Sequence, residues 1–323
     1  MGGGQSFPLV SMTTDRVIVV TGATSGIGYQ IAKWCAMLGA TVILACRSED
    51  KTRRAIEQMN HEFEVEKSRG TEGLCHRQTL ALEYMNLDLA SFKSVLGFCE
   101  EFKNSGRKLH VLFCNAGLGL GPYVKTEDNL ELLLQVNYLS HFIVIGKLLS
   151  VLKASGPDCR ILLMSSAAHH AGSFDLKTMN YTGEPDNYAR MNYYGRSKLY
   201  QIMQATSMAR RLGNSNVTIN SIHPGVVDTE FGSEAACCWR CLLGCSKFIG
   251  VSRTPIEGAQ CGIDLAVNPK HAGVTGHYWV DCKITSPNGT AMNVEKQEAL
   301  WQETLTFVGE HLTSEEIAGL EGK

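Results

Sequence analysis

Short runs of apolar, β-branched residues alternate with longer amphipathic segments along most of this chain. The runs have the length of buried strands, and the segments between them repeat apolar residues at the spacing of a helix face. This alternation is typical of βαβ units around a parallel sheet. We predict a single doubly wound α/β domain with a mostly parallel seven-stranded sheet, its strands at residues 17–20, 41–46, 81–87, 109–114, 160–164, 217–222 and 277–280.

Glycines mark the ends of two expected helices. Gly39 follows the first amphipathic segment, and Gly213 follows the segment 197–212. The charged stretch 63–79 reads as a surface insertion, and no repeat or linker divides the chain. We expect one domain over residues 15–312, with a flexible N-terminal tail at 1–14 and a C-terminal tail at 313–323.

The longest apolar stretch covers residues 132–152. Polar side chains interrupt it at Gln135, Asn137, His141 and Lys147. Because a membrane span requires about 20 predominantly apolar residues, this stretch predicts a buried or amphipathic helix rather than a transmembrane segment.

The composition narrows the class of protein. Apolar residues make up 44% of the chain and the formal net charge is −2, so we expect no nucleic-acid partner. The 12 cysteines are scattered over predicted elements, which indicates a reducing, cytoplasmic location. Cys237, Cys238 and Cys241 lie close together, but no second ligand pair at zinc-finger spacing accompanies them, so we expect no metal.

The first six residues, MGGGQS, match the myristoylation consensus with Gly2 as the acceptor. The alternative interpretation is an unmodified flexible tail. One acyl chain binds membranes only reversibly. A myristoylated Gly2 would therefore place this cytoplasmic protein peripherally on intracellular membranes, with an acylated cysteine or apolar side chains at 237–245 as the second contact.

A glycine-rich turn follows the first predicted strand. Residues 21–28 read TGATSGIG, and an amphipathic helix begins after them. Glycines allow a tight turn with bare backbone, and the helix N-terminus offers free N–H groups and a positive dipole end to a pyrophosphate. This junction predicts a dinucleotide site formed by Gly22, Ser25, Gly26, Ile27 and Gly28.

Polar residues with catalytic potential occur downstream of this turn. Tyr194 and Lys198 lie four residues apart in a predicted helix and so share one face. Ser166 and Asn115 follow predicted strands, where ligands bind in such sheets, and Asn137 lies in the helix before Ser166. Each residue also has a structural interpretation, because Asn115 could hold a turn and Asn137 could be a satisfied core amide.

Taken together, these motifs make residues 16–312 similar to the short-chain dehydrogenase/reductase family, which implies a Rossmann-type fold. They are TGATSGIG at 21–28, NLDL at 86–89, NAG at 115–117, Asn137, SS at 165–166, YGRSK at 194–198 and HPG at 223–225. The retinol-dehydrogenase-like branch is indicated by ACR at 45–47, VNYLSHF at 136–142, GAQ at 258–260 and DCK at 281–283. Cys114 replaces the first Asn of the family's NNAG turn, and the N-terminal membrane helix common in that branch is missing.

The resemblance assigns a role to each candidate residue. Tyr194 is the general acid/base, and Lys198 lowers its pKa and holds the nicotinamide ribose. Ser166 binds the substrate oxygen, and Asn137 orients a water in a proton relay. Asn115 is chiefly structural. The resemblance extends the cofactor site to Asp88 at the adenine and to Pro224, Gly225, Val227 and Thr229 over the nicotinamide.

The end of the second strand bears on cofactor choice. NAD-binding folds usually place an acidic residue there, whereas this chain has Arg47 after Cys46. A guanidinium suits a 2′-phosphate, so we expect NADP(H). Glu49 and Asp50 keep NAD(H) as the less favoured alternative.

The segment 231–251 is unusually apolar, and the equivalent segment lids the substrate pocket in this family. It predicts a small lipophilic substrate such as a retinoid, steroid or lipid aldehyde, although these residues could instead complete the core. We therefore expect an NADP(H)-dependent oxidoreductase that interconverts a carbonyl and an alcohol. The alternative is a catalytically silent dinucleotide-binding regulator or scaffold. By resemblance, the helices flanking Asn137 and Tyr194 could form a homodimer face.

Overall fold

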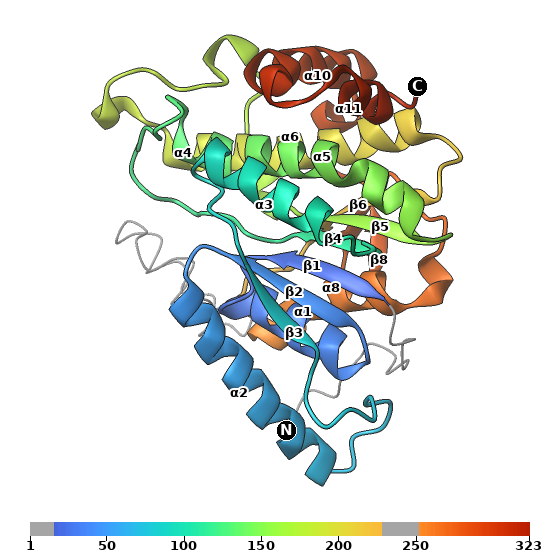
Figure 1. Cartoon of the computed structure of the whole chain (residues 1–323). Helices are drawn as coiled ribbons and strands as arrows, with labels where there is room; N and C mark the ends of the chain where they lie inside the picture. The colour runs from blue at the N-terminus through green and yellow to red at the C-terminus, as the bar shows by residue number, and fades with distance from the viewer. Residues whose placement is uncertain (1–15, 228–251) are drawn as a thin grey trace.

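The computed structural model describes residues 16–227 and 252–323, which form one doubly wound α/β unit (Figure 1). Eight strands lie in one sheet in the order β3-β2-β1-β4-β5-β6-β7-β8. Every pair is parallel except β7 with β8. The strands are β1 (Val17–Thr21), β2 (Thr41–Cys46), β3 (Leu82–Asn86), β4 (Val111–Cys114), β5 (Cys159–Met164), β6 (Val217–His223), β7 (Tyr278–Val280) and β8 (Lys283–Thr285).

The seven predicted strands are confirmed, and β8 is an additional strand. Its three residues are all exposed, so it has no buried apolar run to reveal it in the sequence. It pairs with β7 across the two-residue turn Asp281–Cys282, in which both residues have positive φ angles of 52° and 57°. Such turns match the twist of a two-stranded hairpin.

The helices cover both faces of the sheet. Figure 1 shows α1, α2 and α8 on one side and α3, α5 and α6 on the other, with α10 and α11 outside them. Along β1, Val19 packs into one core, and Ile18 and Val20 pack into the other, as alternate side chains of a strand must. The helices are α1 (Gly26–Met37), α2 (Glu49–Ser68), α3 (Phe92–Asn104), α4 (Leu132–Leu134), α5 (Ser140–Ser155), α6 (Arg190–Leu212), α8 (Pro255–Val267), α9 (Gly289–Met292), α10 (Val294–Val308) and α11 (Ser314–Leu320).

Short helical turns complete the described elements. A π-helical turn, η1 (Gln135–Leu139), joins α4 to α5, and such turns often mark functional sites. The 3₁₀ turns are η2 (Ala167–Ala171), η3 (Leu176–Thr178), η4 (Pro185–Asn187), η6 (Pro269–His271) and η7 (Gly309–His311).

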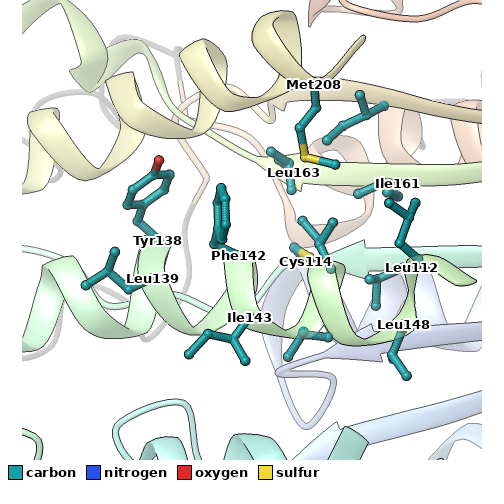
Figure 2. Packing of buried hydrophobic residues seen from close by; sticks show 14 of the residues in the cluster. Leu112, Cys114, Tyr138, Leu139, Phe142, Ile143, Leu148, Ile161, Leu163 and Met208 are labelled. Carbon is teal, nitrogen blue, oxygen red and sulfur yellow. The ribbon is translucent and has the colours of Figure 1, made fainter. Parts of the chain in front are cut away.

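The long apolar stretch is the central core helix. Among the described residues, Leu132–Ser155 is the one stretch long and apolar enough to cross a membrane, yet 89% of its apolar window is buried inside the protein. Figure 2 shows Leu148 of this helix near Leu112 of β4 and Phe142 on the side of Cys114, with Met208 of α6 across the same core. These contacts agree with the expected buried helix.

The expected C-terminal tail is instead an ordered helix. Thr313 caps α11 with a capping box, and Leu320 is fully buried against Gly146 of α5. Glu316 forms ion pairs of 2.8 Å with both Lys103 and Lys147. The helix has only seven residues, and such a short helix gives a weak periodic signal, which is why the sequence pattern missed it.

The expected surface insertion at 63–79 is also partly wrong. Helix α2 continues through Ser68, and Phe63 is fully buried on its inner face. The charged residues occupy the solvent side of the same turns, so an amphipathic helix end resembled a loop in the sequence.

Candidate active site

The glycine-rich turn leaves β1 at Thr21 and enters α1 at Gly26, as predicted. Gly22 and Gly26 have φ angles of 67° and 59°, which favour glycine. A Cβ on Gly28 would lie 2.4 Å from the carbonyl oxygen of Gly22. The bare backbone of this turn and the N-terminus of α1 form a cradle of the kind that fits a pyrophosphate.

Asn115 holds this turn in place. Its Nδ2 donates to the carbonyl oxygens of Thr21 at 3.0 Å and Gly22 at 3.2 Å. Its backbone N–H donates to Oγ1 of Thr21 at 3.0 Å. These bonds tie the end of β4 to the turn after β1, so the geometry matches the structural interpretation of Asn115.

The end of β2 presents a cationic side chain to the same edge of the sheet. Arg47 is exposed, and its side chain makes no hydrogen bond or ion pair with the residues that the structure describes. The carboxylate of Glu49 binds Arg53 of its own helix at 2.5 Å. Cys46 points inward, where its Sγ accepts the backbone N–H of Ala23 at 3.2 Å. At this strand end, Arg47 is therefore unpaired among the described residues and Glu49 is already paired, whereas Asp50 is also exposed and forms no ion pair with the described residues.

The catalytic candidates meet where α6 crosses the end of β5. Tyr194 and Lys198 lie one turn apart on α6, and the side chains of Ser166 and Tyr194 share a hydrogen bond. Nζ of Lys198 lies 5.8 Å from the centre of the Tyr194 ring and donates to the carbonyl oxygen of Met164 at 2.8 Å. Ser165 is buried and donates to the carbonyl oxygen of Lys198, which leaves Ser166 as the serine at the phenol.

Burial controls the protonation of this pair. It raises the pKa of Tyr194 from its ordinary 10.0 to about 12, and the hydrogen bond with Ser166 opposes this shift. Burial also lowers the pKa of Lys198 from 10.5 to about 7. Burial and the Ser166 hydrogen bond are the causes of the shift at Tyr194, so the expected effect of Lys198 on the pKa of Tyr194 stays a prediction.

Asn137 lies in the π-helical turn η1 and is fully buried. Its Oδ1 accepts the backbone N–H of Leu118 at 2.7 Å, and its Nδ2 donates to Oγ of Ser197 at 3.0 Å and to the carbonyl oxygen of Leu118 at 3.1 Å. A Cβ on Gly117 would lie 3.1 Å from Oδ1 of Asn137 and 3.4 Å from Nζ of Lys198. Asn137 and Lys198 therefore converge on the same small space beside Gly117.

Two residues of this network were absent from the sequence-based set. Gln201 is buried and donates from Nε2 to the carbonyl oxygen of Asn137 at 2.8 Å. It lies three residues after Lys198, so helical spacing could have placed it on the same face. Because Gly117 has no side chain, it leaves room for the side chains of Asn137 and Lys198. Only the three-dimensional contact reveals that role.

An aromatic wall adjoins the phenol of Tyr194. We define it as Tyr123, Tyr181, Tyr188 and Tyr193, which pack with Tyr194 in one apolar cluster. Tyr188 and Tyr193 stack with ring centres 4.8 Å apart. The wall comes from three separate segments, so the sequence pattern did not bring it together.

The remaining cofactor candidates lie at strand ends. Asp88 follows β3, and its Oδ1 accepts the backbone N–H of Ala90 at 2.9 Å. Pro224, Gly225 and Val227 follow β6, and Val227 pairs with Arg253.

Several predicted features lie outside the described residues. They are Gly2, Thr229, the apolar segment 231–251 and the cysteines at 237, 238, 241 and 245. In the part of the chain that is described, no group of three or more His, Cys, Asp or Glu side chains could hold a metal ion.

Known proteins resemble this chain in both sequence and fold. A short chain dehydrogenase family model matches residues 16–236. Retinol dehydrogenase 14 of Mus musculus is 37% identical over 312 residues, covering 95% of this chain and 89% of the relative. Polyprenol dehydrogenase of Mus musculus is 35% identical over 309 residues, covering 94% and 86%. The fold also resembles L-sorbose reductase of Gluconobacter frateurii complexed with NADPH, with a TM-score of 0.63, 19% identity and coverage of 86% and 98%.

Proposed function

The chain belongs to the short-chain dehydrogenase/reductase family, and from this premise we propose that it is an NADP(H)-dependent oxidoreductase. Its substrate is a lipophilic carbonyl or the matching alcohol. The observation that carries this proposal is the hydrogen bond between Ser166 and Tyr194 above Lys198. Two hydroxyl groups that meet at one point can both hold the oxygen of a carbonyl substrate.

In the proposed mechanism, Tyr194 transfers the proton. Burial raises the pKa of its phenol to about 12, so the group is protonated at neutral pH and can donate to the developing alkoxide. Ser166 donates a hydrogen bond to the same oxygen as negative charge grows there. When its own amine is protonated, Lys198 stabilises the phenolate that remains after Tyr194 has donated its proton.

Asn137 and Gln201 act as positioning residues in this proposal. Asn137 fixes the loop at Leu118 through two hydrogen bonds, and Gln201 fixes the carbonyl oxygen of Asn137. Both keep the π-helical turn in register with α6, which carries Tyr194 and Lys198. Geometry held in this way favours proton transfer because the reacting groups require little reorganisation.

The turn at Gly22 and Gly28 would hold the dinucleotide, with its phosphates at the N-terminus of α1. When bound, the nicotinamide supplies or accepts the hydride. The exposed guanidinium of Arg47 supports a preference for a 2′-phosphate, since no described carboxylate neutralises it.

A lipophilic substrate is supported by the surroundings of the phenol. The aromatic wall lies beside Tyr194, and two apolar side chains at strand-end loops, Leu118 and Val226, are 39% and 40% exposed. Apolar surface of this kind favours a ligand with a hydrocarbon body. The relatives named for retinol and polyprenol support the same substrate class.

The direct test measures NADPH consumption by absorbance with the purified protein. We would offer all-trans-retinal, a polyprenal, a ketosteroid and a short aliphatic aldehyde at equal concentration. We expect turnover with a long apolar carbonyl and weaker turnover with the short aldehyde. NADPH binding without turnover of any carbonyl would contradict the enzymatic proposal and favour the catalytically silent alternative.

A further inference from the structure

Two cysteines line a cavity whose walls do not include Tyr194. The cavity has a volume of about 500 Å³ and lies between α8 and the turn that joins β7 to β8. Cys261 of α8 and Cys282 of the turn both line it, together with His223 and Arg253. The proposed catalytic mechanism uses neither thiol.

The two thiols are free and interact with each other. Cys261 is buried, Cys282 is half-buried, and their side chains are hydrogen-bond partners. The other free cysteines that the structure describes are all buried, at positions 35, 46, 75, 99, 114 and 159. Within the described chain, Cys282 is therefore the thiol that both has a thiol partner and reaches solvent.

The backbone at Cys282 is held in an uncommon conformation. Asp281 and Cys282 have φ angles of 52° and 57°, in the left-handed region that non-glycine residues rarely adopt. The carboxylate of Asp281 binds the guanidinium of Arg253, which fixes the turn against the cavity. This turn orients the Cys282 side chain toward Cys261 on the facing helix.

We propose that Cys261 and Cys282 form a redox-responsive pair that a peroxide converts to a disulfide between α8 and the β7–β8 turn. The Cys282 thiolate attacks hydrogen peroxide, which gives a sulfenic acid and hydroxide. The Cys261 thiol then attacks the sulfenic sulfur, the S–S bond forms and water leaves. The net reaction consumes two thiols and one peroxide and yields one disulfide and two waters. A dithiol reductant reverses it.

The environment supports this division of roles. The hydrogen bond from Cys261 lowers the pKa of Cys282, and the positive charge of Lys270 acts in the same direction. The pKa of Cys261 is raised because its thiol donates that hydrogen bond and is buried. Because the thiolate is the nucleophile, Cys282 reacts first and Cys261 resolves the product. Burial and the carboxylates of Asp264 and Asp281 raise the pKa of Cys282, but the net direction of the shift stays downward.

The experiment treats the purified full chain with one to a few equivalents of hydrogen peroxide, alkylates the remaining thiols and digests with trypsin. Cleavage after Arg253, Lys270 and Lys283 places Cys261 in peptide 254–270 and Cys282 in peptide 271–283. We expect a cross-linked pair of these two peptides as the main oxidised product of the described cysteines, lost again after dithiothreitol. Full alkylation of both peptides after peroxide, or a cross-link of either to another cysteine as the main product, would overturn the proposal.

Single variants separate the two roles. Cys261→Ser should leave Cys282 as a sulfenic acid that dimedone traps, whereas Cys282→Ser should leave Cys261 as an alkylatable thiol. Cys99→Ser, at a buried thiol on the opposite side of the sheet, serves as the matched control and should form the cross-link as wild type does. Dimedone labelling of Cys261 instead of Cys282 would contradict the assigned order. The wild-type measurement remains decisive even if a variant folds poorly.

Discussion

Lys198 donates from Nζ to the carbonyl oxygen of Met164, the last residue of β5, at 2.8 Å. This bond holds the side-chain amine of Lys198, on α6, against the end of the strand that Ser166 follows. Lys198 is 3% exposed, and burial lowers the pKa of its amine to about 7. The protein therefore holds a titratable amine at the centre of its proposed site.

Lys198→Met tests this burial through the pH dependence of stability. The unfolded chain keeps the proton on Lys198 up to about pH 10.5, whereas the folded chain releases it near pH 7. Between these values the group makes wild type more stable as pH rises, by at most about 1.4 kcal/mol per pH unit. The stability of the Met variant relative to wild type should therefore be greatest below pH 7 and decline toward pH 10. Urea unfolding at several pH values measures this, and a pH-independent difference would contradict the lowered pKa.

Gly28→Ala tests the dinucleotide cradle. The added Cβ would lie 2.4 Å from both the carbonyl oxygen of Gly22 and Nδ2 of Asn115, so the turn must shift. We expect a destabilisation of about 1–3 kcal/mol and a loss of NADPH affinity of roughly tenfold or more. The control is Gly97→Ala on α3, where nothing lies within 4 Å, and it should stabilise the protein by about 0.5–1 kcal/mol. Unchanged NADPH affinity in Gly28→Ala, by fluorescence titration, would place the dinucleotide elsewhere.

Arg47→Asp tests the cofactor preference. It removes the phosphate partner at the end of β2 and adds a repulsive charge, so the ratio of NADPH to NADH affinity should fall by roughly 100-fold. Arg69→Asp, at the far end of α2, is the exposed control and should leave the ratio unchanged. Tighter binding of NADH than of NADPH by wild type would show that Arg47 is only a surface charge.

The C-terminal helices bear on oligomeric state. Trp301 of α10 packs against Phe142 of α5 with ring centres 5.1 Å apart, and the guanidinium of Arg211 of α6 lies 4.0 Å from the Trp301 ring centre. Together with α11, this helix covers the outward faces of α5 and α6 (Figure 1), the surface on which the family resemblance placed a possible homodimer. Light scattering should therefore give a monomer of about 35.3 kDa. A stable dimer mass would contradict this prediction.

The sequence was sufficient to predict the sheet because buried parallel strands leave continuous apolar runs. It was insufficient for α11, whose seven residues carry too little periodicity, and for β8, whose side chains are all exposed. At the site, Tyr194 and Lys198 follow from helical spacing and family motifs. The raised pKa of Tyr194 does not follow from the sequence, because desolvation depends on the packing of distant segments around the phenol.

The most direct measurement compares turnover of Tyr194→Phe and Tyr193→Phe on a reducible lipophilic aldehyde, with NADPH affinity determined in parallel. The two tyrosines are neighbours on α6, but only Tyr194 hydrogen-bonds Ser166 in the proposed proton path. Tyr194→Phe should lose about 10²–10⁴-fold in kcat and bind NADPH within a few-fold of wild type. Tyr193→Phe keeps the stacked ring on Tyr188 and should retain most of the activity. Full activity in Tyr194→Phe would contradict the proposed mechanism.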